Sequence, residues 1–375
     1  MNIKSPVDIR PGSDIERQLV EVLRRLLGDA SWLRGWSVEP AKDHAWDLRA
    51  SGAVPGSGKV VLCVEVKKNF TPSQFNSVVN RPCDGGRHKA VSRVLAMPRV
   101  SPRLAALCRE HGWSWFDLAG NCRLEIPGVL LIERSGNSPV RAEPRSGANL
   151  STPEAARVVR ALLAPENARQ RWTQREFVSH FADLPTLIPA PSLALVNKVV
   201  QHLRDQAFLE PLPNRGFRVK DHEGLLRTWR EAYRFDRHSR RRCFTLLRGQ
   251  ALQDRLSSFD SKNPNLATYC VFSAADIQAP AVRQPRTWLF VDPLGESALM
   301  TALDAKSVDS GENLVVLVAD DPGVFYKAEI KPGRLACTNA VQTYVDLSHA
   351  GGRGAEAAEA ILEQRLRPAW AASAR

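Results

Sequence analysis

Residues 59–75 have the sequence KVVLCVEVKKNFTPSQF, a run of apolar and β-branched residues that ends in charged ones. The run from Lys59 to Val66 predicts a strand buried in the core of a sheet. Glu65 and Lys67 stand two positions apart at its end, and alternation along a strand places both side chains on the same face. Burying a carboxylate and an ammonium is costly unless they serve each other or a ligand. The pattern therefore predicts either a structural ion pair or a functional site at this strand end.

The residues on both sides of this strand predict an α/β domain. A helix, three strands, a second helix and a further strand follow one another, which is an α/β order. We expect helices over 13–28, 71–79 and 101–112, and strands over 36–39, 46–50, 59–66, 92–98, 114–118, 121–126 and 129–134.

The chain is long enough for several domains. Its 375 residues exceed the size of one ordinary core. Residues 135–154 are polar and rich in Pro, Gly and Ser, which predicts a domain boundary. We predict a multi-domain α/β protein with an N-terminal domain over 1–137, a helical domain over 151–235 and a C-terminal α/β domain over 238–375. In the last domain we expect strands over 267–273, 287–292, 313–319 and 343–347, and a closing helix over 352–366.

The charge of the chain is strongly basic. Its formal net charge is +12 and its isoelectric point is about 9.7. Residues 141–260 alone contain 21 Lys and Arg against 13 Asp and Glu. A basic excess favours a polyanionic partner, here nucleic acid rather than a membrane, because no basic amphipathic anchor is evident. The basic run at 234–244 is either a solvated face or an additional phosphate contact.

Cysteine usage and apolar runs indicate a cytoplasmic protein. The seven cysteines are scattered and form no CxxC pair, so we expect reduced thiols with neither a disulfide nor a zinc site. No apolar run approaches the roughly 20 residues that span a bilayer. The first residues contain no apolar segment typical of a secretory signal.

Asp47 belongs to the predicted strand over 46–50 and can meet Glu65 and Lys67 if the two strands pair. Two carboxylates with a backbone carbonyl form an all-oxygen site suited to Mg²⁺. The lysine can then orient or help deprotonate a metal-bound water, and stabilise charge that builds on a phosphate. In the alternative interpretation, Asp47 is an exposed strand residue beside a structural Glu65–Lys67 pair.

Asp47 followed by VEVKK resembles the active-site signature of the PD-(D/E)xK nuclease superfamily. Residues 65–67 match its (D/E)-x-K element, and the predicted element order is similar to the αβββαβ core of this restriction-endonuclease-like fold. The resemblance implies that Asp47, Glu65 and Lys67 are catalytic, and that Asp47 and Glu65 bind Mg²⁺ or Mn²⁺. No cofactor is expected if the site is inactive.

Two further residues are catalytic candidates by this resemblance. Members often have a Glu on the first helix, for which Glu16 is the candidate, and some have a Gln on the helix after the motif, for which Gln74 is the candidate. Glu16 also has a structural alternative, because Ser13 and Glu16 form the S-x-x-E pattern of a helix capping box.

Residues 151–235 have the pattern of a winged helix-turn-helix. Three short helices are followed by two short strands around an Asn-Arg-Gly turn. In this fold the third helix enters the major groove and the wing follows phosphates. The alternatives are a solvated helix face or a protein-interaction module. The predicted DNA-binding residues are Ser192, Asn197, Lys198, Gln201 and Arg204 on the third helix, with Asn214, Arg215 and Arg218 on the wing.

Three motifs, CVEVKK…TPSQF, FDLAGN and QTYVDL…GGRGAEAAE, together resemble the AbiEi-type antitoxin and regulator families of type IV toxin–antitoxin systems. Within the second motif, Asp117 and the Gly120–Asn121 turn are explained most simply as a hairpin turn whose amides Asp117 binds. The resemblance implies a regulatory role and a cognate toxin as a protein partner; a homodimer remains open.

The sequence thus predicts a cytoplasmic protein that binds double-stranded DNA, a transcriptional regulator or antitoxin-like protein retaining a nuclease fold. The alternative is an active Mg²⁺-dependent DNA endonuclease that uses Asp47, Glu65 and Lys67 and is targeted by the winged helix. A partner-binding protein whose basic charge is incidental ranks below both.

Overall fold

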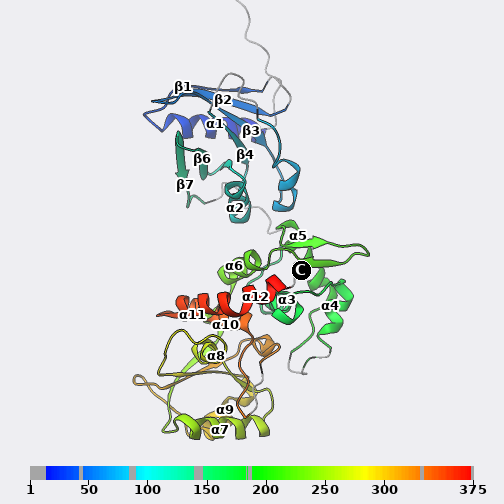
Figure 1. Cartoon of the computed structure of the whole chain (residues 1–375), viewed down its shortest axis with the longest axis vertical. Helices are drawn as coiled ribbons and strands as arrows, with labels where there is room; N and C mark the ends of the chain where they lie inside the picture. The colour runs from blue at the N-terminus through cyan, green and yellow to red at the C-terminus, as the bar shows by residue number, and fades with distance from the viewer. Residues whose placement is uncertain are drawn as a thin grey trace, which may run out of the picture. The chain divides into compact units, whose positions relative to one another are not determined.

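The computed structural model describes residues 14–41, 45–83, 90–138, 147–182, 184, 188–329 and 333–372 (Figure 1). They form a mixed α/β structure, as the sequence predicts. The chain divides into two compact units, residues 1–146 and 147–375. The predicted linker over 135–154 spans this division, whereas the predicted boundary between 235 and 238 falls inside the second unit. No helix in the described ranges is long and apolar enough to cross a membrane.

The N-terminal unit is built around one sheet. Its elements are α1 (Asp14–Gly28), β1 (Arg34–Pro40), β2 (Leu48–Val54), β3 (Gly58–Val66), the 3₁₀ helix η1 (Pro72–Ser77), β4 (Ala90–Met97), α2 (Pro102–Glu110), β5 (Trp113–Asp117), β6 (Cys122–Ile126) and β7 (Leu130–Arg134).

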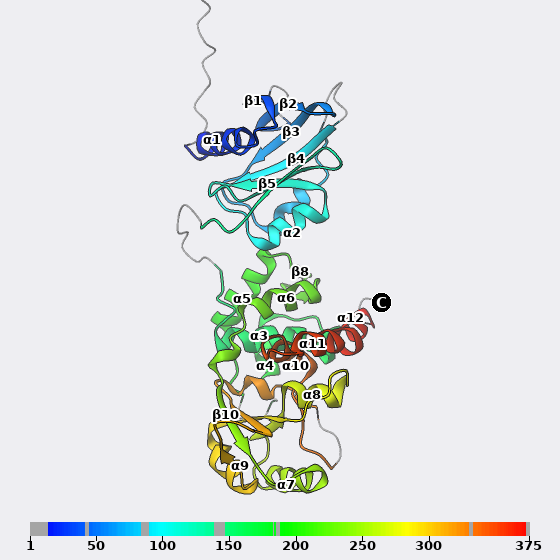
Figure 2. The same ribbon diagram turned by 90° about the vertical axis from the view of Figure 1, so that its left-hand side faces the viewer.

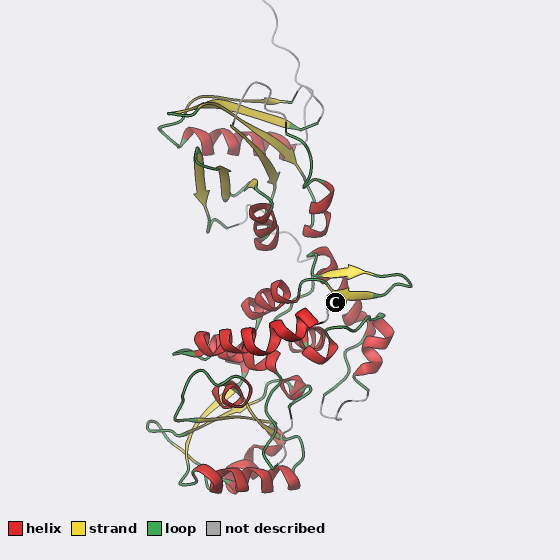
Figure 3. Ribbon diagram, in the orientation of Figure 1, coloured by secondary structure: helices red, strands yellow, loops and turns green. Residues whose placement is uncertain are grey.

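The seven strands of this sheet lie in sequence order from β1 to β7. Figure 3 shows the strands of the sheet in yellow and the helices beside it in red. β3, β4 and β5 are parallel, and the other neighbouring pairs are antiparallel. Parallel neighbours need a crossover, which η1 supplies between β3 and β4 and α2 between β4 and β5. The helix–three strands–helix–strand order predicted from the sequence is therefore present.

Helices cover both faces of the sheet (Figure 2). The apolar residues of α1 share one core with Val60, Leu62 and Val64 of β3. Residues of η1 and α2 share another core with Val61 and Cys63, which alternate to the opposite face. β3 is therefore buried on both faces, which explains its nearly unbroken apolar run. β2 begins at Leu48, so Asp47 lies one residue before the strand rather than inside it.

Cys63 and Cys83 form a disulfide, so the prediction that all seven cysteines are reduced thiols is wrong. The chain that follows η1 runs back past the end of β3 and brings these two residues together. Twenty positions separate them in the sequence, so no local spacing indicates the pair. The remaining cysteines are free and buried.

The turn between β5 and β6 confirms the structural role predicted for Asp117. Its carboxylate accepts a hydrogen bond from the backbone of Asn121, with an N···O distance of 3.0 Å. Gly120 has a φ of +83°, a conformation that glycine adopts without strain. These residues therefore shape a tight hairpin.

The C-terminal unit contains a helical part and a second sheet. Its helices are α3 (Pro153–Leu163), η2 (Pro165–Asn167), α4 (Gln174–His180), α5 (Leu193–Asp205), α6 (His222–Ala232), η3 (Phe235–Arg237), α7 (Gly249–Lys262), α8 (Val271–Gln278), η4 (Pro293–Gly295), α9 (Glu296–Ala302), η5 (Pro322–Phe325), α10 (Ala340–His349), α11 (Gly354–Ile361), the π-helix η6 (Leu362–Leu366) and α12 (Arg367–Ala372). Its strands are β8 (Leu209–Pro211), β9 (Phe217–Val219), β10 (Ser239–Phe244), β11 (Ala267–Tyr269), β12 (Thr287–Val291), β13 (Lys306–Ser307) and β14 (Leu314–Val318).

The elements from α3 to β9 follow the predicted order of three helices and a hairpin. β8 and β9 are antiparallel, and Trp172 forms an additional antiparallel bridge with Phe217 of β9. The core of this α3–β9 segment is continuous with that of α6, α8, α10 and α11. The helices on both sides of the boundary predicted at 235–238 are therefore packed into one core.

The second sheet has the strand order β11-β12-β14-β10-β13. The prediction of a strand over 343–347 is wrong, because these residues lie in α10. Every residue from Ala340 to Leu347 is buried, so no polar face reveals the helical period. Likewise, the predicted strand over 267–273 stops at Tyr269 and α8 begins at Val271. The sequence does not indicate β10, because its arginines interrupt any apolar alternation.

A buried polar network joins α3 to α10. Arg160 is 2% exposed, and its guanidinium donates from Nε to Oε1 of Gln342 at 2.7 Å. Gln342 donates in turn to Oδ1 of Asp346 at 2.7 Å, and the Tyr233 hydroxyl donates to the same oxygen at 2.9 Å. His238 completes the group through the Tyr233 hydroxyl at 2.9 Å. Residues from the QTYVDL motif thus connect the α3–β9 segment to the rest of the unit.

Burial raises the pKa of Asp346 to about 7. The folded protein then keeps a proton on Asp346 up to that pH, whereas the unfolded chain releases it near pH 4. This carboxyl group stabilises the fold most at low pH, and its contribution is lost as the pH rises from about 4 to 7. We predict that Asp346→Asn gains stability relative to wild type by up to about 1.4 kcal/mol per pH unit across this window. Urea unfolding of both proteins at pH 5 and pH 7 measures the difference; a constant difference would contradict it.

Candidate functional site

α5 presents a polar face to solvent. Ser192 caps its N-terminus by accepting from the Leu195 backbone amide at 3.2 Å. Apolar residues at helical spacing, among them Val196 and Val200, are buried in the core. Asn197 and Lys198 lie between these buried positions and are exposed, as is Gln201 one turn later. The structure thus brings four of the predicted contact residues, Ser192, Asn197, Lys198 and Gln201, onto the accessible surface of one helix.

Some polar side chains of α5 already form hydrogen bonds within the protein, and others do not. The Asn197 side chain accepts a hydrogen bond from Gln174 of α4 at 3.2 Å, which links the two helices. The Gln201 amide donates to Asp205 at 2.9 Å along the helix. Within the described part of the chain, Lys198 has no hydrogen bond or ion pair. Its ammonium is therefore available to an anion.

Arg204 is placed differently from the other candidates on α5. Its guanidinium donates to the backbone carbonyl of Gly216 at 3.2 Å and lies over the Phe217 ring, 5.7 Å from its centroid. The side chain is half-buried and joins α5 to the β8–β9 hairpin. Its position indicates support of the hairpin rather than a free surface cation.

The β8–β9 hairpin carries the remaining candidates. Asn214 and Arg215 form its tip, both exposed and both with φ near +60°. Arg218 on β9 forms an ion pair with Glu210, directly opposite on β8. Arg215 has no such partner among the described residues. Among the described residues, Arg215 at the hairpin tip thus has no acidic partner, whereas the charge of Arg218 on β9 is neutralised by Glu210.

Three exposed cations that the sequence analysis did not select accompany these residues. Arg171 precedes the Trp172 bridge, Arg175 lies on α4, and Lys220 follows β9. None of the three has an ion pair within the described ranges. These three residues could not be selected from the sequence, because only folding places them beside α5 and the hairpin.

The basic run at 234–244 is largely engaged within the C-terminal unit. Arg234 pairs with Asp236, Arg241 with Glu296 and Arg242 with Glu312, at distances of 2.7, 2.7 and 2.8 Å. Arg240 lies 4.9 Å from the centroid of the Trp288 ring. These contacts favour the interpretation of a solvated structural face over a phosphate contact.

In the N-terminal unit, Asp47, Glu65 and Lys67 lie at one end of β3. Glu65 is 2% exposed, and its Oε1 is 2.5 Å from Nζ of Lys67. The exposed carboxylate of Asp47 accepts a hydrogen bond from the backbone amide of Val66 at 2.7 Å. Val66 lies between Glu65 and Lys67 in the sequence, so this hydrogen bond holds the Asp47 carboxylate beside them.

Arg81 is the residue at this site that the sequence analysis missed. Its guanidinium forms an ion pair with Oε2 of Glu65 and lies over the Trp46 ring, 5.6 Å from the centroid. Both oxygens of Glu65 therefore already accept from cations. Within the described residues, no group of three or more His, Cys, Asp or Glu side chains is arranged to hold a metal ion. In this conformation the site does not fit Mg²⁺, which needs free carboxylate oxygens.

The structure does not add Glu16 or Gln74 to this cluster. Glu16 lies in the first turn of α1, the helix that packs on the face of β3 opposite to Glu65. Its predicted capping partner, Ser13, lies outside the described residues. The Gln74 side chain accepts from the Thr71 backbone amide at 2.9 Å, so its oxygen caps η1.

Comparison with family models matches part of the chain. Residues 218–367 match a family model described as a transcriptional regulator, the AbiEi antitoxin of type IV TA systems. No curated protein and no solved structure matches the chain significantly. The matched residues run from β9 to the start of α12 and include the QTYVDL motif and most of the buried polar network. The matched residues make up less than half of the chain and leave the α5 surface and the N-terminal unit outside the match.

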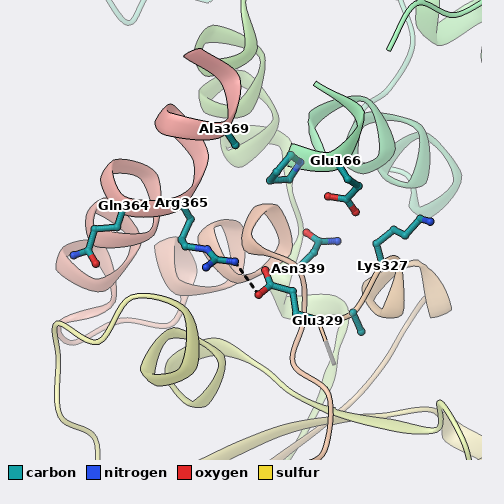
Figure 4. Close-up of a pocket in the computed structure, with 9 residues that line it drawn as sticks. Glu166, Lys327, Glu329, Asn339, Gln364, Arg365 and Ala369 are labelled. Carbon is teal, nitrogen blue, oxygen red and sulfur yellow. Dashed lines mark hydrogen bonds and ion pairs between the residues drawn. The ribbon is translucent and has the colours of Figure 1, made fainter. Parts of the chain in front are cut away.

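A surface cavity of about 800 Å³ lies mainly within the matched region (Figure 4). Glu329 and Arg365 form an ion pair of 3.0 Å on one side of it, and Glu166 and Lys327 lie on the other. The cavity thus has carboxylates and cations in equal number. The charges that line the cavity therefore favour the binding of neither a nucleic acid nor a metal cation.

Proposed function

We propose that this chain is a DNA-binding transcriptional regulator of the antitoxin type, which contacts duplex DNA through a winged helix formed by the α3–β9 segment. The observation that carries the proposal is the exposed polar face of α5, with Asn197, Lys198 and Gln201, beside the basic tip of a hairpin. The family match over residues 218–367 supports the regulatory role. In this proposal α5 enters the major groove and the hairpin follows the backbone.

The chemistry of these side chains suits the proposed contacts. The Asn197 and Gln201 amides can form paired hydrogen bonds with adenine, whereas Lys198 suits guanine or phosphate. Arg215 reaches phosphate from the hairpin tip. The predicted contribution of Arg204 becomes indirect, because its guanidinium holds the hairpin against α5.

The two hairpin arginines provide a matched test. Arg215→Ala should weaken binding to all duplexes alike and lower the slope of log affinity against log salt by about one, since one phosphate contact is lost. Arg218→Ala should change the slope less, because Glu210 already compensates that charge. Fluorescence anisotropy with labelled duplexes at several KCl concentrations measures both slopes. Equal effects of the two variants would contradict the assignment of Arg215 to phosphate.

The second candidate function is a Mg²⁺- or Mn²⁺-dependent DNA endonuclease with catalytic Asp47, Glu65 and Lys67. The grouping of these three residues at the end of β3 favours it. The ion pair between Arg81 and Glu65 opposes it in this conformation. Incubation of supercoiled plasmid with the protein and Mg²⁺, Mn²⁺ or EDTA distinguishes the two functions. The regulator proposal expects intact plasmid throughout, whereas metal-dependent nicking would support the nuclease.

Two protein partners belong to the proposal. A cognate toxin is the partner that the family description suggests. A homodimer would match a palindromic DNA site, since a two-fold protein binds two half-sites one helical turn apart. Light scattering of the protein with and without duplex DNA measures the number of chains bound.

A further inference from the structure

The surface cavity of about 800 Å³ lies within the C-terminal unit. It is lined by residues of η2, η6 and α12 and by the segment that follows η5. Its volume falls within the range of about 300–1,000 Å³ that is usual for ligand sites. Pro165, Ala328 and Ala369 line it with small apolar side chains, which leave room for a ligand. The cavity therefore has the size and the partly apolar lining of a small-molecule site.

The charged side chains on the two sides of the cavity differ in their pairing (Figure 4). On one side, Glu329 forms its ion pair with Arg365 and also accepts a hydrogen bond from Nε2 of Gln278 at 3.1 Å. On the other side, Glu166 and Lys327 are accessible to solvent, and neither forms an ion pair within the described part of the chain. One carboxylate and one ammonium group are therefore available to a ligand on the same side of the cavity.

Buried hydrogen bonds hold the backbone beside these two residues in a fixed arrangement. Asn167 follows Glu166 in η2 and Tyr326 precedes Lys327, and both Asn167 and Tyr326 are buried. Nδ2 of Asn167 donates to the hydroxyl oxygen of Tyr326 at 2.9 Å. Asn339, which lines the cavity, donates from Nδ2 to the backbone carbonyl of Tyr326 at 2.5 Å. The two free charges are thus carried on segments that are already ordered, which lowers the cost of binding a ligand.

Two unusual backbone conformations occur at the wall of this cavity. Lys327 has a φ of +48°, which residues with a side chain rarely adopt and which costs free energy. Gln364 and Arg365 belong to η6, a turn of π-helix, and such turns are frequent at functional sites. Strained and irregular backbone of this kind clusters at ligand sites. Its occurrence at one cavity supports a binding role for the residues that line it.

We propose that this cavity binds a small zwitterion, a free amino acid or a short peptide, whose ammonium group pairs with Glu166 and whose carboxylate pairs with Lys327. A ligand with a single charge would satisfy one of these residues and leave the other without a partner. A zwitterion satisfies both, and its zero net charge agrees with the equal numbers of carboxylates and cations around the cavity. The ion pair between Glu329 and Arg365 stays intact, because the ligand uses the opposite side. This site does not depend on DNA binding through α5.

Isothermal titration calorimetry of the full-length protein tests the site, with each standard amino acid and the dipeptides glycylglycine and alanylalanine as probes. We expect at least one probe to bind with a Kd of about 1 mM or lower. The amide of that probe lacks the carboxylate and its N-acetyl derivative lacks the ammonium group, so each should bind at least about tenfold more weakly. Binding of amino acids alone or of dipeptides alone identifies the source of the zwitterion. If no probe binds, or if both derivatives bind as tightly as the probe, the proposal is overturned.

Two variants assign each charge of the ligand to its residue. Lys327→Gln should bind the probe at least about tenfold more weakly and no longer distinguish it from its amide, while the N-acetyl derivative still binds more weakly. Glu166→Gln should show the reverse selectivity. Glu154→Gln and Lys262→Gln remove exposed charges of the same kinds from α3 and α7, outside the cavity, and should bind the probe as wild type does. Wild-type affinity and selectivity in both cavity variants would place the binding elsewhere and overturn the proposal.

Discussion

Replacing Asn197 and Lys198 together with alanine should lower the affinity of the full-length protein for its specific DNA site by about a hundredfold or more. Each base or phosphate contact of this kind contributes about 1–3 kcal/mol, and the two side chains are adjacent on the exposed face of α5. Neither is part of the hydrophobic core, so the fold should be preserved. The loss should exceed that caused by any single change in the hairpin.

The matched control replaces the same kinds of side chain, an amide and a cation, on a different helix. Gln250 and Arg255 are an exposed amide and an exposed cation on α7, in the same unit. Their double alanine variant lowers the net charge as much as the α5 variant does and should bind DNA almost as tightly as wild type. Anisotropy titrations with selected and scrambled duplexes compare the three proteins. Equal loss in both variants would show that overall charge, rather than α5, provides the affinity.

Arg160→Ala should destabilise the C-terminal unit by about 2–4 kcal/mol, because it removes a buried side chain and leaves the side-chain oxygen of Gln342 without its donor. Its guanidinium binds Gln342 and lies over the Trp229 ring, 5.4 Å from the centroid. Without it, the side-chain oxygen of Gln342 is buried with no donor. The measurement is urea unfolding followed by circular dichroism.

A surface variant supplies the comparison for this prediction. Arg234→Ala breaks an exposed ion pair with Asp236 and should leave the unfolding midpoint unchanged. Stability of Arg160→Ala equal to that of Arg234→Ala would mean that the network does not hold α3 to α10. Because α3 carries the α5 surface through their shared core, the Arg160 variant should also lose DNA binding at temperatures where it unfolds.

The fold of the N-terminal unit could be predicted because its strands carry local signals. The apolar run of β3 and the helical spacing in α1 both indicate their elements directly. Arg81 and the Cys63–Cys83 pair could not be predicted, since they reach β3 through a return of the chain that no local spacing encodes. As predicted, Glu65 and Lys67 lie together at the end of β3. Glu65 pairs with Lys67 and also with Arg81, which the sequence does not indicate.

In the C-terminal unit, local sequence signals predict some elements, whereas complete burial hides the type of others. Its helix–hairpin order follows from caps and turns that the sequence displays, such as Ser192 before α5. In α10, burial on all sides removes the polar face that identifies a helix, so the apolar residues of QTYVDL resemble a strand. The candidates on α5 were selected by helical spacing, which identifies exposure well. The roles of Arg204 and Arg218 depend on neighbours that only folding brings close.

The central claim, that the α3–β9 segment binds duplex DNA, is tested most directly by the salt dependence of binding by the full-length protein. Affinity for a labelled duplex is measured between low and physiological KCl, for wild type and for the Asn197, Lys198 double alanine variant. The account predicts a linear fall of log affinity with log salt, with a slope of about −0.9 for each phosphate contacted, and weak, nonspecific binding by the variant. Absent binding, binding that does not respond to salt, or a variant indistinguishable from wild type would contradict it.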